Sequence, residues 1–348
     1  MTTHAAVRHG ILAMACGLVA AAAGPSPRAE SPAPVPVIFD TDICEDCDDV
    51  AALAMLHALE SRGRCRLLAV TVTADHPQAA PFVDCIDTFY GRPDIPIGVV
   101  GPGGVKAPSG YLKLAAEKGA AGFRYPHDLL DGKDAPDAVA VLRKTLAAAE
   151  DGSVVVIQVG FSTNLARLLA SPADALSPLP GVDLVAKKVQ LLELMAGAFE
   201  PIQGSPAYGE YNVVRDREAA AAVAAGWPTE VVWSGFEIGV ALPYPSRSIV
   251  EDFRDVPHHP VAEAYRIVSP PPQDRPSWDL SSVLDAVLGD RGYFDRSPPG
   301  RVAVTDQGAT VFTPDAAGKH RYLVLRDAAA RARVIEALVQ FASQPACR

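Results

Sequence analysis

Short apolar runs alternate with alanine- and leucine-rich segments along most of the chain. The runs are rich in β-branched residues and predict buried strands, and the segments between them predict helices. A strand that starts at residue 37, a helix that ends near residue 59 and a strand over 66–73 form a first βαβ unit. The pattern therefore predicts an open α/β sheet.

The same pattern continues to the carboxyl end of the chain. It predicts helices over 79–90, 136–150, 165–170, 216–225, 278–288 and 328–341, strands over 97–100, 153–159, 189–195 and 230–232, and a hairpin of 301–304 with 310–312. In the helix over 136–150 the proline would occupy the first turn. Residues 102–133 are irregular and rich in glycine and charge, which is typical of a long loop over a functional site.

The stretch between the first strand and the first helix concentrates negative charge. Six acids lie within ten residues: Asp40, Asp42, Glu45, Asp46, Asp48 and Asp49. Their mutual repulsion would reduce stability unless some are protonated or a cation neutralises them, and clusters of oxygen ligands suit calcium or magnesium. The alternative is a solvated acidic loop with an aspartate N-cap. The position favours the first interpretation, because open α/β sheets bind ligands at the carboxyl ends of their strands.

Further polar residues follow other predicted strands, and each has two interpretations. His76 is either a loop residue or a ligand contact, and Gly160 either lets the backbone approach a ligand or belongs to an ordinary strand-to-helix turn. Glu210 and Asn212 would point to the same side of an extended segment and hydrogen-bond a polyol, or form a polar edge before a helix. Asp279 is either an acid at a helix N-terminus or a ligand.

Composition narrows the class of ligand. The 348 residues are 49% hydrophobic, enough to bury a sizeable core, and a formal net charge of −10 with a pI near 5.3 argues against binding to a nucleic-acid backbone. No basic stripe interleaved with aromatic residues occurs along the sequence. We therefore expect a small or cation-associated ligand and no nucleic-acid partner.

The amino terminus is typical of an exported protein. A charged start, an apolar segment over 10–23 and small residues at its end indicate a secretory signal peptide, and the apolar segment is too short to span a membrane. We expect a signal peptide at residues 1–23, a proline-rich linker at 24–36 and one domain at 37–345. Cys16 matches a lipoprotein processing site poorly, so periplasmic or secreted protein is favoured over a lipid-anchored form.

Five cysteines remain after the signal peptide: Cys44, Cys47, Cys65, Cys85 and Cys347. The odd number leaves at least one thiol free or paired between chains. Cys44 and Cys47 form a C-x-x-C motif within the acidic stretch, and without a second such motif or nearby histidines, apolar packing or a local disulfide is favoured over zinc binding.

Four motifs together resemble one enzyme family. DTDICEDCDDVAAL resembles the amino-terminal aspartate motif of the inosine–uridine-preferring nucleoside hydrolases, and GFSTNLARLL resembles their Gly-x-x-Thr-Asn-Leu element. Glu210-Tyr211-Asn212 is similar to their Glu-Phe-Asn element, and Trp278-Asp279 stands where the family has its late aspartate. The motifs occur in the family's order over roughly residues 36–290, a combination far more specific than any one of them.

The resemblance implies a single α/β domain with a mainly parallel, mixed central sheet flanked by helices, similar to a Rossmann fold. It implies calcium-dependent hydrolysis of the N-glycosidic bond of ribonucleosides to ribose and free base, with Asp42 as the base that activates a metal-bound water. The implied calcium ligands are Asp42, Asp49, the carbonyl of Val159, and Asp279, and the implied ribose contacts are Asp48, Glu210, Asn212 and Met195. The chemistry is consistent, because carboxylates stabilise the oxocarbenium character of a ribosyl centre that is losing its base.

Three positions depart from the family pattern. His76 stands where a ribose-binding asparagine is usual, and Trp278 stands where several members have a histidine that protonates the leaving base. The longer loop at 43–47 resembles a bacterial, often exported branch, and its Glu45 and Asp46 have no assigned role, so we expect them to be solvated.

Two alternative functions remain open from the sequence. Ile38 to Asp42 resembles the strand and Asp-x-Asp of haloacid dehalogenase-type phosphatases, in which Asp40 would be the nucleophile and magnesium the cofactor. That class also requires a later lysine and an acidic pair at a strand end. The sequence shows no convincing pair, and the class leaves Asp48 and Asp49 unexplained. A calcium-dependent binding protein without turnover would explain the missing leaving-group acid. A homo-oligomer is compatible with either function.

Overall fold

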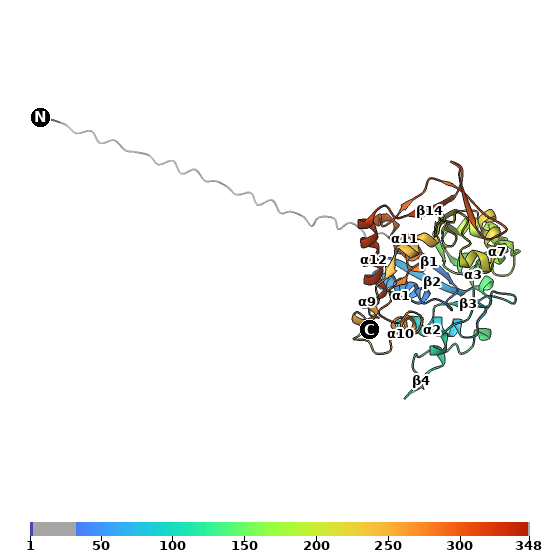
Figure 1. The fold of residues 1–348 in the computed structure, drawn as a ribbon, viewed down its shortest axis with the longest axis horizontal. Helices are drawn as coiled ribbons and strands as arrows, with labels where there is room; N and C mark the ends of the chain where they lie inside the picture. Colours follow the sequence, from blue (N-terminus) through green and yellow to red (C-terminus); the bar gives the residue numbers. More distant parts are fainter. Residues whose placement is uncertain (3–32, 121, 347–348) are drawn as a thin grey trace. The chain divides into compact units, whose positions relative to one another are not determined.

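The computed structural model describes residues 1–2, 33–120 and 122–346. A 10-stranded sheet forms the centre of the domain (Figure 1). The strand order is β13-β12-β14-β8-β7-β6-β1-β2-β3. Every neighbour from β14 across to β3 is parallel: β14 (His320–Val324), β8 (Glu230–Ser234), β7 (Val189–Met195), β6 (Val154–Gln158), β1 (Val35–Thr41), β2 (Cys65–Val72) and β3 (Ile97–Val99). The expected α/β fold with a mainly parallel sheet is confirmed.

Antiparallel strands complete one edge of this sheet and make it mixed. β12 (Gly300–Val304) and β13 (Thr310–Pro314) form the expected hairpin, and β11 (Asp295–Arg296) pairs with β14. Two short separate pairs are β9 (Pro243–Tyr244) with β10 (Arg275–Pro276), and β4 (Lys118–Gly119) with β5 (Gly122–Phe123).

Helices cover both faces of the sheet, since side chains of a strand point alternately to either side. Val37 and Phe39 of β1 belong to one buried cluster, whereas Ile38 between them belongs to the other. The first cluster includes α1 (Asp48–Ser61), α2 (Ala79–Phe89), α10 (Pro260–Val268), α11 (Asp279–Leu288) and α12 (Ala328–Ala342). The second includes α3 (Ala138–Ala148), α4 (Thr163–Ala170), α5 (Gly181–Lys188) and α7 (Arg217–Gly226).

The chain order of the strands reverses between β1 and β6. From β1 the chain continues through β2 to β3 on one side, and it then returns to place β6, β7 and β8 on the other side. Loops that leave the carboxyl ends of β1 and β6 therefore diverge and leave a crevice, which is where open α/β sheets bind ligands. Asp42 follows β1 at this point and Val159 follows β6.

Several boundaries differ from those expected. β1 begins at Val35, two residues inside the expected linker, because Val35 already pairs with Cys65 of β2. Pro136 precedes α3 instead of occupying its first turn, since Asp137 is the N-cap and accepts hydrogen bonds from the next backbone N–H groups. The structure also contains α5, which the pattern did not predict, and α8 (Phe236–Ala241), which occupies most of the segment after β8.

The predicted loop over 102–133 contains only short elements. They are the 3-10 helices η1 (Leu112–Ala116) and η2 (Gly132–Asp134) and the pair β4–β5. The remaining elements are α6 (Tyr211–Arg215), α9 (Ser246–Glu251) and η3 (Gly289–Arg291). The expected signal peptide and Cys16 lie outside the described residues. Of the helices in the described ranges, none has the length and hydropathy needed to cross a membrane.

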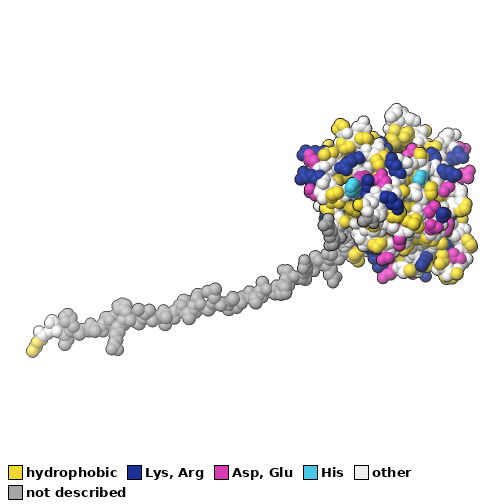
Figure 2. Space-filling model, turned by 90° about the horizontal axis from the view of Figure 1, so that it is seen from below, with side chains coloured by type: hydrophobic (Ala, Val, Ile, Leu, Met, Phe, Trp, Pro, Cys, Tyr) yellow, Lys and Arg dark blue, Asp and Glu magenta, His cyan; other side chains and the backbone are white. Residues whose placement is uncertain are grey.

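Cys44, Cys47, Cys65 and Cys85 are free thiols and are buried. The Cys44 thiol donates to the carbonyl of Ala107 at 3.1 Å, so it holds the acidic loop to the segment behind it. Of the two expected roles for the C-x-x-C motif, the structure shows apolar packing and no local disulfide; Cys347 lies outside the described residues. On the face drawn in Figure 2, acidic and basic side chains are interspersed among neutral and apolar ones.

Candidate active site

A cavity of about 240 Å³ opens at the point where the strand order reverses. It is lined by Asp42, Glu45, Asp46, Asp48, Asp49, Val159, Met195, Glu210, Tyr211, Asn212, Phe236, Arg275, Trp278 and Asp279. All the residues assigned from the family resemblance, apart from His76, therefore lie around one cavity. Its volume is just below the roughly 300–1,000 Å³ that is typical of small-ligand pockets, which suits a small molecule and not a polymer.

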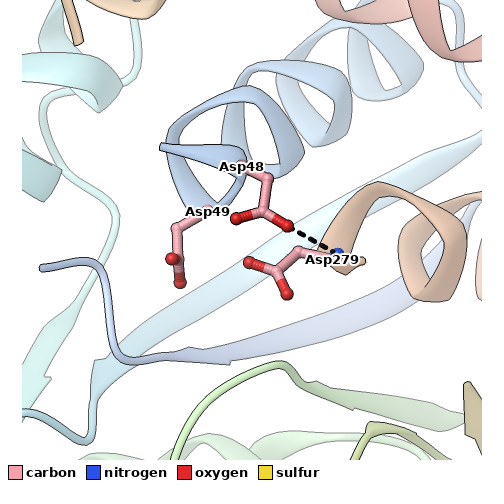
Figure 3. A group of neighbouring side chains, drawn as sticks. All are labelled: Asp48, Asp49 and Asp279. Carbon is pink, nitrogen blue, oxygen red and sulfur yellow. Dashed lines mark hydrogen bonds between the residues drawn. The ribbon is translucent and has the colours of Figure 1, made fainter. Parts of the chain in front are cut away.

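Three carboxylates meet on one side of the cavity, at the N-termini of two helices (Figure 3). Asp48 and Asp49 begin α1, Asp279 begins α11, and one oxygen of each lies within 4.8 Å of the others. Asp48 Oδ2 accepts from the backbone N–H of Trp278 at 2.9 Å and of Asp279 at 3.2 Å, so it joins the two helices. The hydroxyl of Thr41 donates to Asp49 Oδ1 and fixes that carboxylate from the side of β1.

Burial and mutual repulsion raise the pKa of each of these three carboxyl groups well above its ordinary value. Burial is the larger cause, and the charges of neighbouring aspartates add to it. Such a set could hold a hard divalent cation, because it offers only oxygen donors and its negative charge lacks a cationic partner at hydrogen-bond distance among the described residues. The donor set therefore fits the metal that the resemblance implies.

Asp42 lies beside this group but is not one of its three members. Burial, then the charge of Asp48, raises the pKa of Asp42 well above its ordinary value. Gly160 explains how Asp42 is placed, because a Cβ at position 160 would lie 2.4 Å from the backbone nitrogen of Asp42. The close approach that requires a glycine at position 160 is therefore to the backbone of the aspartate loop.

Glu210 and Asn212 also line the cavity, in a geometry that differs from the expected one. They do not alternate along an extended segment: Glu210 is the N-cap of α6 and Asn212 lies within it. Glu210 accepts from the backbone N–H of Asn212 at 2.9 Å and of Gly197 at 3.1 Å, yet burial raises its pKa to about 7. The Asn212 amide donates to the carbonyls of Val159 at 3.0 Å and Met195 at 3.2 Å, which joins the ends of β6 and β7.

The expectation that Asp46 is merely solvated is wrong, whereas Glu45 is exposed to solvent as expected. Arg275 forms a two-point ion pair with Asp46, through Nε to Oδ1 at 3.1 Å and through Nη2 to Oδ2. The hydroxyl of Tyr211 donates to the carboxylate of Glu45. Both acids line the cavity and connect the aspartate loop to distant segments across its mouth.

His76 is not brought to this cavity. It lines a separate cavity of about 500 Å³ with residues of the 99–102 and 131–137 segments, and its Nδ1 accepts from the backbone N–H of Gln78. The loop over 102–133 does not line the active-site cavity either. It lies behind the aspartate loop, where the hydroxyl of Tyr111 donates to the carbonyl of Asp46 at 2.7 Å.

Asp40 is fully buried and does not line the cavity. Its Oδ1 accepts from the hydroxyl of Thr71 at 2.5 Å and the amide of Asn164 at 2.9 Å, and burial raises its pKa to about 7. A phosphatase nucleophile must reach its substrate, so the position of Asp40 contradicts the dehalogenase-type alternative. Its hydrogen bonds instead connect β1 to β2 and α4.

Arg275, Tyr211 and Phe236 line the cavity but were not among the predicted site residues. Tyr211 could have been predicted from the sequence, since it stands between the predicted contacts Glu210 and Asn212. Arg275 lies in a proline-rich segment with no periodicity, and its partner Asp46 is 229 residues away, so no local pattern could have identified the pair.

The fold and this cavity define an α/β protein with a carboxylate-lined cavity at the reversal point of a mainly parallel sheet. Residues 37–316 match the family model described as inosine-uridine preferring nucleoside hydrolase. The chain belongs to this family of metal-dependent enzymes, and it is an N-glycosidic hydrolase. A comparison with curated protein sequences gave no match.

Solved structures of similar fold include several nucleoside hydrolases. The inosine-uridine preferring nucleoside hydrolase of Bacillus anthracis has a TM-score of 0.66 and 18% identity, with 89% of this chain and 99% of that chain covered. An inosine-guanosine nucleoside hydrolase has a TM-score of 0.65, 20% identity and coverage of 88% and 98%. The purine-preferring ribonucleoside hydrolase of Gardnerella vaginalis has a TM-score of 0.65, 16% identity and coverage of 88% and 99%. At these identities the likeness shows the shared fold.

Proposed function

We propose that this protein is a calcium-dependent hydrolase of ribonucleosides that releases ribose and the free base. The observation that carries the proposal is the meeting of Asp48, Asp49 and Asp279 beside Asp42 in one cavity. Calcium fits because all the donors are oxygens from flexible carboxylates and a backbone carbonyl. A bound calcium would neutralise part of the carboxylate charge and lower the pKa of a coordinated water.

Asp49 and Asp279 belong both to the observed group and to the ligand set implied by the resemblance, so we assign them as the central ligands. Asp42 and the carbonyl of Val159 would complete the set. One oxygen of Asp48 is already held by the N-terminus of α11, which leaves Oδ1 to face the ligand. We assign that oxygen to a ribose hydroxyl.

The side chains around the cavity have different roles in the proposed reaction. Asp42 accepts a proton from the attacking water, because its carboxylate lies beside the group that would hold the metal and its water. Glu210 and Asn212 line the same cavity and would hold ribose hydroxyls. The surrounding carboxylates stabilise the positive charge that develops on the ribosyl ring as the bond to the base breaks.

Ribose release from a panel of ribonucleosides, with and without a calcium chelator, tests the proposal. We expect release that chelation abolishes and added calcium restores, and much weaker release from 2′-deoxyribonucleosides, because a missing hydroxyl leaves its buried partner unpaired. Replacement of Asp42 by Asn should reduce kcat by at least about 100-fold with the fold intact. An unchanged rate in Asp42→Asn would contradict the base role, and tight ribose binding without release would indicate a binding protein.

We also propose that the protein is exported through a cleaved signal peptide at residues 1–23, as in the longer-loop branch that the aspartate motif resembles. The support is the order of charged, apolar and small residues in the sequence. Intact-mass measurement of the protein purified from its native cells would give the mature amino terminus. A start near residue 24 is expected, and an unprocessed chain in the cytoplasm would contradict export.

A further inference from the structure

We propose that Arg275 stabilises the departing nucleobase by hydrogen bonding, in the role that a proton-donating histidine has in other enzymes of this kind. The inference rests on the proposed function, since it concerns the leaving group of that reaction. It begins from a chemical requirement: a base that leaves a sugar takes the bonding electron pair and carries negative charge unless it is protonated or otherwise stabilised.

Apart from Arg275, the charged side chains around the cavity would repel a negatively charged leaving group. Seven carboxylates line it: Asp42, Glu45, Asp46, Asp48, Asp49, Glu210 and Asp279. Arg275 is the single cationic side chain among the lining residues, and no histidine is among them. A bound divalent cation would offset charge at the Asp48, Asp49 and Asp279 side, so Arg275 supplies the positive charge for the remaining part of the cavity.

Arg275 is held in place by Asp46. Two of its nitrogens, Nε and Nη2, are bonded to the two oxygens of that carboxylate, a geometry that fixes the plane of the guanidinium. Asp46 is itself fixed, because its Oδ1 also accepts from the backbone N–H of Cys47 at 2.7 Å. Nη1 of Arg275 makes no hydrogen bond within the described residues, so its two N–H groups remain for a ligand.

Arg275 also continues a wall of flat side chains. Its guanidinium carbon lies 5.7 Å from the centre of the Trp278 ring, and Trp278 stacks on Phe236 with ring centres 5.5 Å apart and planes inclined by 30°. The indole N–H of Trp278 is already donated to the carbonyl of Phe236 at 3.0 Å. Trp278 therefore offers its ring face and no free donor, whereas Arg275 offers donors. Together they suit a flat heteroaromatic base with acceptor atoms on its edge.

The proposed step balances without a proton donor on the enzyme. The bond from C1′ to the base nitrogen breaks, and its electron pair goes to the base. The water oxygen bonds to C1′ and one of its protons goes to Asp42. The guanidinium donates hydrogen bonds to a ring nitrogen or carbonyl oxygen of the base anion and keeps its own protons, because its pKa is too high for transfer. The base takes a proton from solvent after release, and Asp42 returns its proton to solvent.

Two substrates with different leaving groups test this assignment. Inosine releases a base that needs stabilisation, whereas p-nitrophenyl β-D-ribofuranoside releases p-nitrophenolate, a stable anion that does not. We expect Arg275→Gln to lower kcat/KM for inosine by about 100-fold, the usual effect of removing one donor to a developing anion. The same variant should lower kcat/KM for the nitrophenyl riboside by less than about threefold, and Arg275→Lys should recover part of the inosine activity, since it keeps the charge.

The matched control is Arg247→Gln, which removes an exposed arginine that also pairs with an acid, Glu251, outside the cavity. It should leave both activities unchanged. Equal losses on both substrates in Arg275→Gln would overturn the inference and indicate a structural role for the Arg275–Asp46 pair. A wild-type enzyme that cleaves neither substrate would overturn the proposed function itself, so the two failures are distinguishable. Thermal melting of each variant establishes that it is folded.

Discussion

The indole ring of Trp278 packs closely against Gly239, so a larger residue at position 239 should be destabilising. A Cβ at position 239 would lie 2.1 Å from Cδ1 of Trp278 and 2.3 Å from Cγ. Both atoms belong to a rigid ring, so Gly239→Ala cannot be accommodated by bending a flexible end. The indole must move away from Gly239 or α8 must shift.

The cost can be worked from the contacts. Overpacking of this kind destabilises by about 1–3 kcal/mol, and loss of the bond from the indole N–H to Phe236 adds about 1 kcal/mol. We therefore expect a loss of about 2–4 kcal/mol in the free energy of unfolding. Because the displaced ring faces the cavity, kcat/KM for a nucleoside should fall by about tenfold, the kinetic equivalent of about 1.4 kcal/mol.

Denaturant unfolding and steady-state kinetics of Gly239→Ala measure both effects, and tryptophan fluorescence should report the movement of Trp278. The matched control is Gly226→Ala at the end of α7, where the nearest atom to an added Cβ is 3.8 Å away. That variant should be neutral or slightly stabilising, because alanine suits a helix better than glycine. If Gly239→Ala unfolds and reacts like the wild type, the packing of Trp278 against Gly239 is refuted.

Two further predictions concern buried charge. Excess calcium at about 100 times its Kd should raise the free energy of unfolding by about 2.7 kcal/mol, and Asp49→Asn should remove most of that gain. A wild-type melting temperature that does not depend on calcium would contradict the assigned site. Glu193 in β7 is fully buried with both oxygens lacking a hydrogen-bond partner among the described residues, and burial followed by the charge of Asp285 raises its pKa well above the ordinary value of 4.5. A carboxyl group with a raised pKa contributes stability at low pH that is lost as the pH rises. Melting temperatures measured from pH 5 to pH 9 should therefore fall less steeply for Glu193→Gln than for the wild type. Parallel curves would show that Glu193 does not cause the pH dependence.

The sequence was most informative where local pattern and chemistry coincide. β1, the aspartate loop and α1 are a strand, a polar turn and a helix in direct succession, so periodicity located them and their position at a strand end indicated a ligand site. The hairpin of β12 and β13 and the strand β7 were predicted for the same reason. Each of these elements is specified by residues that are close together in the chain.

The sequence was least informative where side chains act on distant backbone. Glu210 was expected on an extended segment, but its carboxylate caps α6, a position that favours Ser, Thr, Asp or Asn and so gave no signal. Asp48 was expected only to face the sugar, whereas one of its oxygens holds the backbone of residues 278 and 279. Non-local bonds of this kind follow from the packing of whole elements and have no counterpart in local periodicity.

The two hydrogen bonds between Asp48 and the start of α11 join positions 230 and 231 residues apart. This part of the cavity can therefore form only after most of the chain has been synthesised. The group of three carboxylates includes Asp279, so a nascent chain that ends before this residue lacks part of that group. Closing a loop of this length costs conformational entropy, which the packing of α11 against α1 must offset. A chain truncated before Asp279 should therefore show neither stabilisation by calcium nor activity toward nucleosides.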